Sequence, residues 1–262
     1  MILAGVALVA AVAAYGWSGL RLAAGSRTGG SPLRSRSWWL GTALQGAGFG
    51  FALLARTVLP LLMVQAAIAG ALAVTVLLEH GTGVRRLDAR TAWAVAAVVV
   101  GIGGIASAVL PGSAQAPGAG VVAALWLVAA GAAAATPVLR QAWPLGALAG
   151  CAFGVGAVAA RLLVGTGVGL GEVVRFWAWP AATWAVTLLM PVGIVLGQWA
   201  LTCGLARGSS AAALGGDYLL AVVLPSAAGV LFLGERLRPE TAPLAVLGLL
   251  AAGWGTRRLL NA

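Results

Sequence analysis

The sequence has 262 residues, of which 61% are hydrophobic and 8% are charged, and its mean hydropathy is +1.00. Because these few polar side chains cannot cover the surface of a soluble globular protein, the composition excludes that class of protein. It predicts a multi-pass protein in a lipid bilayer. All 16 basic residues are arginines, and they give a net charge of +10. Because such residues fix topology in a membrane chain, we predict no nucleic-acid partner.

Apolar segments in chain order predict an all-α polytopic bundle of about nine transmembrane helices. They cover residues 2–20, 38–55, 58–84, 91–110, 121–139, 143–160, 181–205, 211–233 and 243–254. At about 1.5 Å per residue, most can cross or nearly cross a hydrocarbon core of about 30 Å. Residues 171–179, which carry two charges, are interpreted as interfacial. We expect one integral membrane domain, with four helices in residues 1–112 and five in residues 120–262.

The arginines predict the orientation in the membrane. Alternate loops on opposite sides place eleven of the 16 arginines on one side and five on the other. The positive-inside rule makes the richer side cytoplasmic, so we expect the N terminus outside and the C terminus inside the cytoplasmic (inner) membrane. Trp38, Trp93 and Trp143 then lie where helices enter from the cytoplasm, as in an aromatic belt.

Two hairpins share a sequence pattern. Residues 85–87 (RRL), 91–92 (TA) and 103 (G) match residues 235–237 (ERL), 241–242 (TA) and 253 (G), each displaced by 150 positions (235 − 85, 241 − 91, 253 − 103). The matched hairpins begin at the third and eighth predicted helices. These are five helices apart, an odd number, so the two hairpins have opposite orientations in the membrane. This pattern predicts an inverted-topology repeat, which places a substrate site between the halves. The alternative is a chance match in a sequence rich in alanine and glycine.

Short motifs carry a family resemblance. Residues 230–237 (VLFLGERL), followed by Gly248 and Gly253, look like the ending of an EamA-type repeat, and residues 198–201 (QWAL) are similar to the pattern that precedes it. Residues 38–41 (WWLG) resemble the opening of the nine-helix NIPA-type magnesium transporters. The chain thus resembles the drug/metabolite transporter superfamily, which implies transport of a small-molecule substrate. The first repeat departs from the pattern, with polar residues 79–83 (EHGTG) where the second is apolar.

Two carboxylates are the first functional candidates, because ionisable groups at membrane depth are costly. Asp217 lies about 9 Å into the eighth predicted helix, and Glu79 lies about one and a half turns inside the end of the third. We therefore expect them at similar depth as substrate-binding or proton-coupling groups, with Tyr218 next to Asp217. The alternative places both in the headgroup zone, solvated or paired with arginines. His80 could relay protons with Glu79 or lie at the interface.

Neutral polar residues within the spans are further candidates. Gln65 and Thr75 share one face of the third predicted helix with Glu79, within about 80° at 100° per residue. Together with Gln198 of the seventh, they could line a path between the third, seventh and eighth helices. The alternative is that they form hydrogen bonds between helices.

Prolines and glycines mark two further features. Pro191 and Pro225 predict breaks in the seventh and eighth helices, which would free backbone groups near a substrate site; simple kinks are the alternative. Gly146, Gly150 and Gly154 form successive Gly-x-x-x-Gly steps, which indicate close helix packing within the chain or in a homodimer.

Missing residue types narrow the function. Without lysine there is no P-loop lysine or Schiff base, and one histidine excludes a multi-histidine metal centre. We therefore expect no enzyme activity, no cofactor and no metal centre. The leading hypothesis is a secondary transporter that exports metabolites or drug-like compounds. One alternative is a NIPA-like divalent cation transporter, for which six acidic residues offer few ligands. The other is a non-transporting assembly subunit of an envelope enzyme.

Overall fold

The computed structural model describes residues 2–27, 31–56, 59, 64, 67–84, 88–110, 118–166, 176–232 and 236–260. Its α-helices are α1 (Ile2–Ser26), α2 (Arg36–Arg56), α4 (Ala71–Gly81), α5 (Ala89–Ser107), α6 (Ala119–Ala135), α7 (Ala142–Gly165), α9 (Ala181–Arg207), α10 (Ser210–Phe232) and α11 (Ala242–Leu260). Shorter elements are the 3-10 helices η1 (Pro32–Arg34) and η2 (Phe176–Ala178) and the two-residue strands β1 (Val109–Leu110) and β2 (Arg236–Leu237). The protein is an all-α helical bundle, as predicted.

Several helices are built to lie in a bilayer. Within the described residues, four are long and apolar enough to cross a membrane: Ile2–Ser26, Ala142–Leu163, Ala181–Arg207 and Ser210–Gly229. Shorter apolar helices cover Ala67–Gly81, Ala89–Ile105, Ala119–Ala135 and Ala242–Gly255. The protein is therefore embedded in a membrane, as its composition predicts. The count of nine spans stays a prediction.

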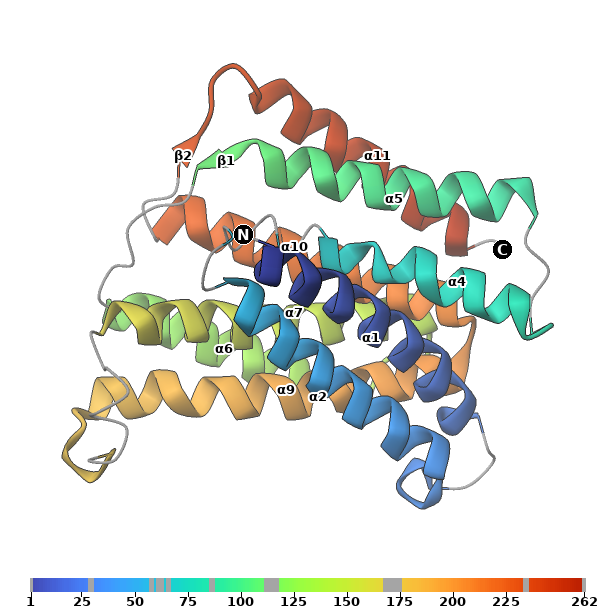
Figure 1. Cartoon of the computed structure of the whole chain (residues 1–262). Helices are drawn as coiled ribbons and strands as arrows, with labels where there is room; N and C mark the ends of the chain where they lie inside the picture. Colours follow the sequence, from blue (N-terminus) through green and yellow to red (C-terminus); the bar gives the residue numbers. More distant parts are fainter. Residues whose placement is uncertain are drawn as a thin grey trace.

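Most helices run across the bundle from left to right or back in Figure 1, and α1 and α2 lie obliquely to them. α1 packs along α2 and α4, whereas α7 packs along α9 and α10, and α6 lies against α7 and α9. α5 and α11 form a pair of their own, which Figure 1 shows at one side of the bundle. α1 and α11 both run from left to right in Figure 1, so the start of α1 and the end of α11 lie at opposite ends of these two helices.

Backbone contact joins α7 to α10. A Cβ atom at Gly146 would clash with the carbonyl oxygen of Ala213, and one at Gly150 would clash with that of Asp217. At Gly154 it would lie 3.1 Å from Cδ2 of Leu224. The Gly-x-x-x-Gly steps therefore pack within the chain, which was one of the two expected uses.

A second glycine contact joins α5 to α11. A Cβ atom at Gly101 would clash with the carbonyl oxygen of Gly248, and one at Gly248 would clash with that of Gly101. Beyond the helices, β1 pairs antiparallel with β2, so the end of α5 is tied to the start of α11. Hydropathy did not predict this two-residue pairing, because so short a bridge has no periodic signal.

The prolines do not break their helices. Pro191 lies inside α9 and Pro225 inside α10, and both helices continue through them. The predicted helix breaks are therefore wrong. Membrane helices tolerate proline because neighbouring helices and small local adjustments satisfy the freed backbone groups. Pro191 is exposed, whereas Pro225 is buried in the α7–α10 contact, where a Cβ atom at Gly154 would lie 3.3 Å from its Cδ.

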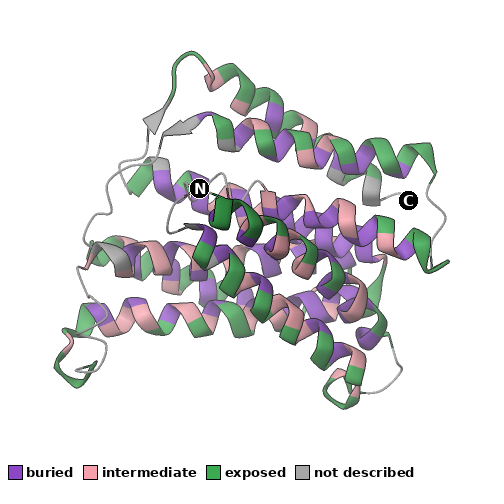
Figure 2. Ribbon diagram, in the orientation of Figure 1, coloured by how far each residue is buried: buried purple, intermediate pink, exposed green. Residues whose placement is uncertain are grey.

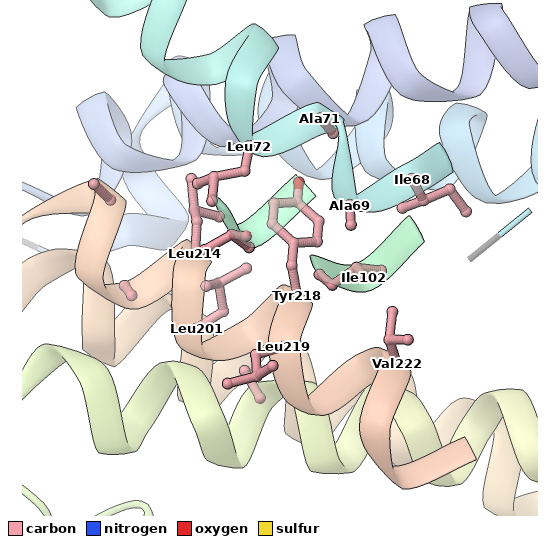
Figure 3. Packing of buried hydrophobic residues seen from close by; sticks show 14 of the residues in the cluster. Ile68, Ala69, Ala71, Leu72, Ile102, Leu201, Leu214, Tyr218, Leu219 and Val222 are labelled. Atoms are coloured by element: carbon pink, nitrogen blue, oxygen red, sulfur yellow. The ribbon is translucent and has the colours of Figure 1, made fainter. Parts of the chain in front are cut away.

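Burial separates the inner and outer faces of the bundle (Figure 2). Large apolar side chains such as Trp93, Leu127 and Val195 are exposed, as expected for surfaces that face lipid. In the interior, Leu72 of α4, Ile102 of α5, and Leu214 of α10 belong to one buried cluster (Figure 3). This cluster joins the two halves of the chain.

The predicted interfacial segment is described only from Phe176. Phe176 and Trp177 are exposed, and the rings of Phe176 and Trp179 both pack against Trp184 near the start of α9. An aromatic group at a helix entrance is typical of a membrane interface. Residues 171–175, which carry the two charges of this segment, lie outside the described residues.

Candidate functional site

A cavity of about 260 Å³ lies between helices of both halves. Its lining residues from the N-terminal half lie on α1, α2 and Ile68 just before α4, and those from the C-terminal half lie on α7, α9 and α10. They are Tyr15, Ser18, Gly19, Leu22, Thr42, Gln45, Gly46, Phe49, Ile68, Phe153, Gly156, Ala157, Met190, Ile194, Gln198, Leu201, Leu214, Asp217, Tyr218 and Ala221. The predicted walls included α9 and α10, whereas α1, α2 and α7 were not expected.

Most of the cavity wall is apolar or aromatic. Four aromatic rings contribute to it, those of Tyr15, Phe49, Phe153 and Tyr218. Aliphatic side chains fill the space between them, and the described lining residues include no arginine and no histidine. Such a wall suits the apolar part of a small organic molecule, with a few polar groups to orient it.

Asp217 is the one carboxylate among the described lining residues. It lies seven residues after Ser210, the first residue of α10, which is about two turns or 10 Å into the helix. Its side chain is 5% exposed, and its buried Oδ1 accepts no hydrogen bond. Buried polar atoms nearly always have a partner, so the unpaired carboxylate oxygen makes Asp217 a candidate for a binding group.

Gln45 presents a second such atom from the opposite half. Its Oε1 is buried and accepts no hydrogen bond, and the residue lines the same cavity. Leaving a buried acceptor without a donor costs roughly 1–3 kcal/mol. A ligand that donates a hydrogen bond to either oxygen would remove this cost. Gln45 was not among the residues predicted from the sequence, although it shares with Gln198 the feature of a polar side chain within an apolar span.

Gln198 is held in the cavity wall by hydrogen bonds between α2 and α9. Its Nε2 donates to Oγ1 of Thr42 over 3.3 Å. One turn further on, Nε1 of Trp38 donates to Oγ1 of Thr202 over 3.0 Å, and this hydroxyl donates to the carbonyl oxygen of Gln198 over 2.7 Å. These bonds connect the two halves beside the cavity and fix the position of the amide.

Tyr218 follows Asp217 on α10 and also lines the cavity. It is buried, and Figure 3 shows its ring extending from α10 toward the segment that carries Ala69 and Ala71. Because neighbouring residues of a helix point about 100° apart, Asp217 and Tyr218 cover adjacent parts of the wall. The cavity thus brings together three predicted residues, namely Asp217, Tyr218 and Gln198.

Glu79 lies elsewhere. It is 1% exposed in the last turn of α4, and its Oε1 accepts a hydrogen bond from Oγ of Ser210. Since Ser210 begins α10, the structure separates Glu79 from Asp217 by about two helical turns, contrary to the similar depth expected. The sequence match between the third and eighth predicted helices indicated how deep each residue lies within its own helix. It did not indicate how far one helix is shifted along the other.

The other polar candidates of the third predicted helix do not line the cavity in the part of the chain that is described. His80 is exposed at the end of α4. Thr75 is buried, and its hydroxyl donates to the carbonyl oxygen of Gly16 on α1 over 2.8 Å. Thr75 therefore has the alternative role, a hydrogen bond between helices. Gln65 lies outside the described residues.

A second contact joins the halves at the end where α9 stops and α10 begins. Nε of Arg27 donates to the carbonyl oxygen of Leu205 over 3.3 Å, and its Nη2 donates to that of Gly208 over 3.0 Å. A cation at the C-terminal end of a helix satisfies free carbonyl groups and the helix dipole. Together with the bond between Ser210 and Glu79, Arg27 holds this end of the two halves together.

Fold and site define a membrane-embedded, all-α protein with a largely apolar cavity that α1, α2, α7, α9 and α10 line. Comparisons with protein families, with curated proteins and with solved structures find no match to this chain. Among the described residues, no group of three or more His, Cys, Asp or Glu side chains could hold a metal ion.

Proposed function

We propose that this chain is a secondary transporter that exports small metabolites or drug-like compounds across the cytoplasmic membrane by alternating access. The observation that supports it best is the cavity lined by both halves, whose wall includes Asp217 and Gln45, each with a buried oxygen that has no donor. A transporter needs such a site between two bodies that can move against each other. The resemblance to the drug/metabolite transporters agrees with this function.

The packing supports the proposed inverted repeat. α1 has α2 and α4 as neighbours, and α7 has the corresponding α9 and α10. In the α5–α11 pair, a Cβ atom at Gly104 would lie 3.0 Å from the carbonyl oxygen of Leu244, and one at Gly255 would clash with that of Ala94. Ala94 and Leu244 are 150 positions apart (244 − 94), and Gly104 and Gly255 are 151 apart (255 − 104). The two contacts therefore join equivalent positions of the two repeats, to within one residue of the displacement of 150.

The opposite positions of the start of α1 and the end of α11 support an odd number of crossings (Figure 1). With the arginine distribution, this favours an N terminus outside and a C terminus in the cytoplasm. Residues 1–112 and 120–262 are then the two halves that rock against each other.

The cavity wall favours an organic substrate over magnesium. Magnesium keeps several waters and binds through oxygen ligands with near-octahedral geometry. The described lining residues offer it one carboxylate, Asp217, surrounded by aromatic and aliphatic side chains. The third hypothesis, an assembly subunit, requires no access to this cavity from the two sides of the membrane.

Thiol labelling tests alternating access without knowledge of the substrate. Gly46 lines the cavity, and a Cβ atom there would meet nothing within 4 Å, so Gly46→Cys introduces a thiol without a clash. The two native cysteines, Cys151 and Cys203, are replaced by alanine in the same chain. The matched control is Gly131→Cys, at an exposed and equally open position on α6 outside the cavity.

Alternating access predicts that a membrane-impermeant maleimide labels the Gly46→Cys thiol in right-side-out cells and also in inside-out vesicles. A ligand in the cavity should slow this labelling and leave the Gly131→Cys control unchanged. Labelling of the Gly46→Cys thiol from one face only, or from neither, would contradict the transporter and favour the assembly subunit.

A further inference from the structure

We infer that the cavity binds a small amine whose nitrogen carries at least two N–H donors, attached to an apolar group of about one ring. The inference rests on the proposed function and specifies its substrate class. Among the described residues, Asp217 of α10 and Gln45 of α2 both line the cavity, and each has a buried oxygen, Oδ1 and Oε1 respectively, that accepts no hydrogen bond.

The two acceptors require donors from the ligand. An unpaired Asp217 carboxylate attracts a cation, because opposite charges interact strongly where water is excluded. A primary or secondary ammonium has a second N–H to donate to a further acceptor such as Gln45, whereas a quaternary ammonium has none. The acceptors therefore select a charged amine with free hydrogens over a fully alkylated one.

The remaining wall fits the other part of the ligand. Tyr15, Phe49, Phe153 and Tyr218 provide aromatic faces that attract cations and pack against an apolar group. No described lining residue is an arginine or a histidine, so the wall has no cation to pair with a carboxylate on the ligand. Amines are therefore favoured over zwitterions and anions.

The volume limits the size of the ligand. Pockets for drug-sized ligands usually measure about 300–1,000 Å³, and this cavity measures about 260 Å³. A single aromatic ring with a short aminoalkyl chain fits this range, which makes phenethylamine a suitable probe.

Isothermal titration calorimetry of the purified wild-type protein in detergent tests the inference. The probes are phenethylamine, its N,N,N-trimethyl derivative, which keeps the charge but has no N–H donor, and 2-phenylethanol, which keeps the shape but is neutral. Phenethylamine should bind about tenfold or more tightly than either analogue, because each analogue leaves a buried acceptor unpaired.

Variants assign the effect to the two acceptors. Asp217→Asn should weaken phenethylamine binding on the order of a hundredfold, because one partner of a buried charge pair is lost. Gln45→Leu should weaken it about tenfold and reduce the preference over the trimethyl derivative, which persists in part because Asp217 Oδ1 still lacks an N–H donor from that derivative. The control is Glu240→Gln, which removes one negative charge from an exposed position outside the cavity and should bind like wild type. Thermal unfolding of each variant shows that it is folded.

Several results would overturn the inference. These are no binding of phenethylamine to wild type, equal binding of 2-phenylethanol, or unchanged binding by folded Asp217→Asn. Equal binding of the trimethyl derivative would remove the requirement for N–H donors. Failure here is distinguishable from failure of the transporter: labelling of the Gly46→Cys thiol from both faces without amine binding leaves a carrier of another substrate class. Amine binding with labelling from one face only leaves a receptor for amines that does not transport them.

Discussion

Two buried carboxylates in this protein have different surroundings. Asp217 has an oxygen without a hydrogen-bond donor beside a cavity, whereas Glu79 accepts a hydrogen bond from Ser210. A carboxylate buried among protein atoms is tolerated when it is paired, and an unpaired one is costly enough to indicate a function. Glu79 is thus a contact between α4 and α10, and Asp217 is the candidate for binding.

The bond between Ser210 and Glu79 is expected to stabilise the fold. Ser210→Ala removes the donor and leaves Glu79 Oε1 buried, so the free energy of unfolding should fall by roughly 1–3 kcal/mol. The control is Ser107→Ala, which removes an exposed hydroxyl that donates to Gly104 over 2.8 Å and should change stability by less than about 0.5 kcal/mol. Thermal unfolding in detergent measures both. Equal stability of the two variants would contradict a structural role for Glu79.

The sequence alone indicated which polar residues lie inside the bundle better than it indicated which neighbours they contact. Asp217, Tyr218 and Gln198 lie in the cavity wall, but Thr75 bonds to α1 and Glu79 bonds to α10. Spacing along a helix gives the depth of a side chain and its angle around the axis. Which neighbour that angle faces depends on how the helices cross, and no local pattern contains this information.

Whole elements were easier to predict than single side chains. Helices such as α7 and α9 follow their apolar segments closely, because a chain in lipid must satisfy its backbone groups internally. The same constraint explains the error at Pro191 and Pro225, since lipid offers backbone groups no other partner and a helix is kept where water would allow a break. The sequence of α1 gave no reason to place this helix at the cavity, because Tyr15 and Ser18 are the only polar residues among the described ones with which it lines the wall.

The α5–α11 contact offers a matched test on one helix. Gly101→Ala places a methyl group against the Gly248 carbonyl oxygen, so the free energy of unfolding should fall by roughly 1–3 kcal/mol. Gly103→Ala, two residues away, meets nothing within 4 Å and should be neutral or stabilise by up to about 1 kcal/mol through helix propensity. Thermal unfolding compares the two. A loss of stability in Gly103→Ala as large as that in Gly101→Ala would show that this pairing is not close.

At the scale of the whole molecule, Arg27 joins the end of α1 to the end of α9, one half to the other. Arg27→Gln should weaken this contact and increase the population in which the halves separate at that end. We expect the Gly46→Cys thiol to be labelled from the cytoplasmic face roughly two- to fivefold faster, the range for an exposed charged contact. The control is Arg34→Gln, an exposed arginine of η1. A labelling rate changed equally by both substitutions would exclude a specific closing contact.

The pairing of α5 with α11 has a consequence for biosynthesis. A ribosome produces α5 before the chain reaches residue 108, but its packing partner begins only at Ala242. While the next 134 residues are made (242 − 108), the glycine face of α5 therefore has lipid or the insertion machinery as its neighbour, because proteins are made from the N-terminal end. Truncation before α11 would leave this face permanently uncovered. Helix α11 is thus the element that covers the glycine face of α5, and this face is completed only after residue 242 has been made.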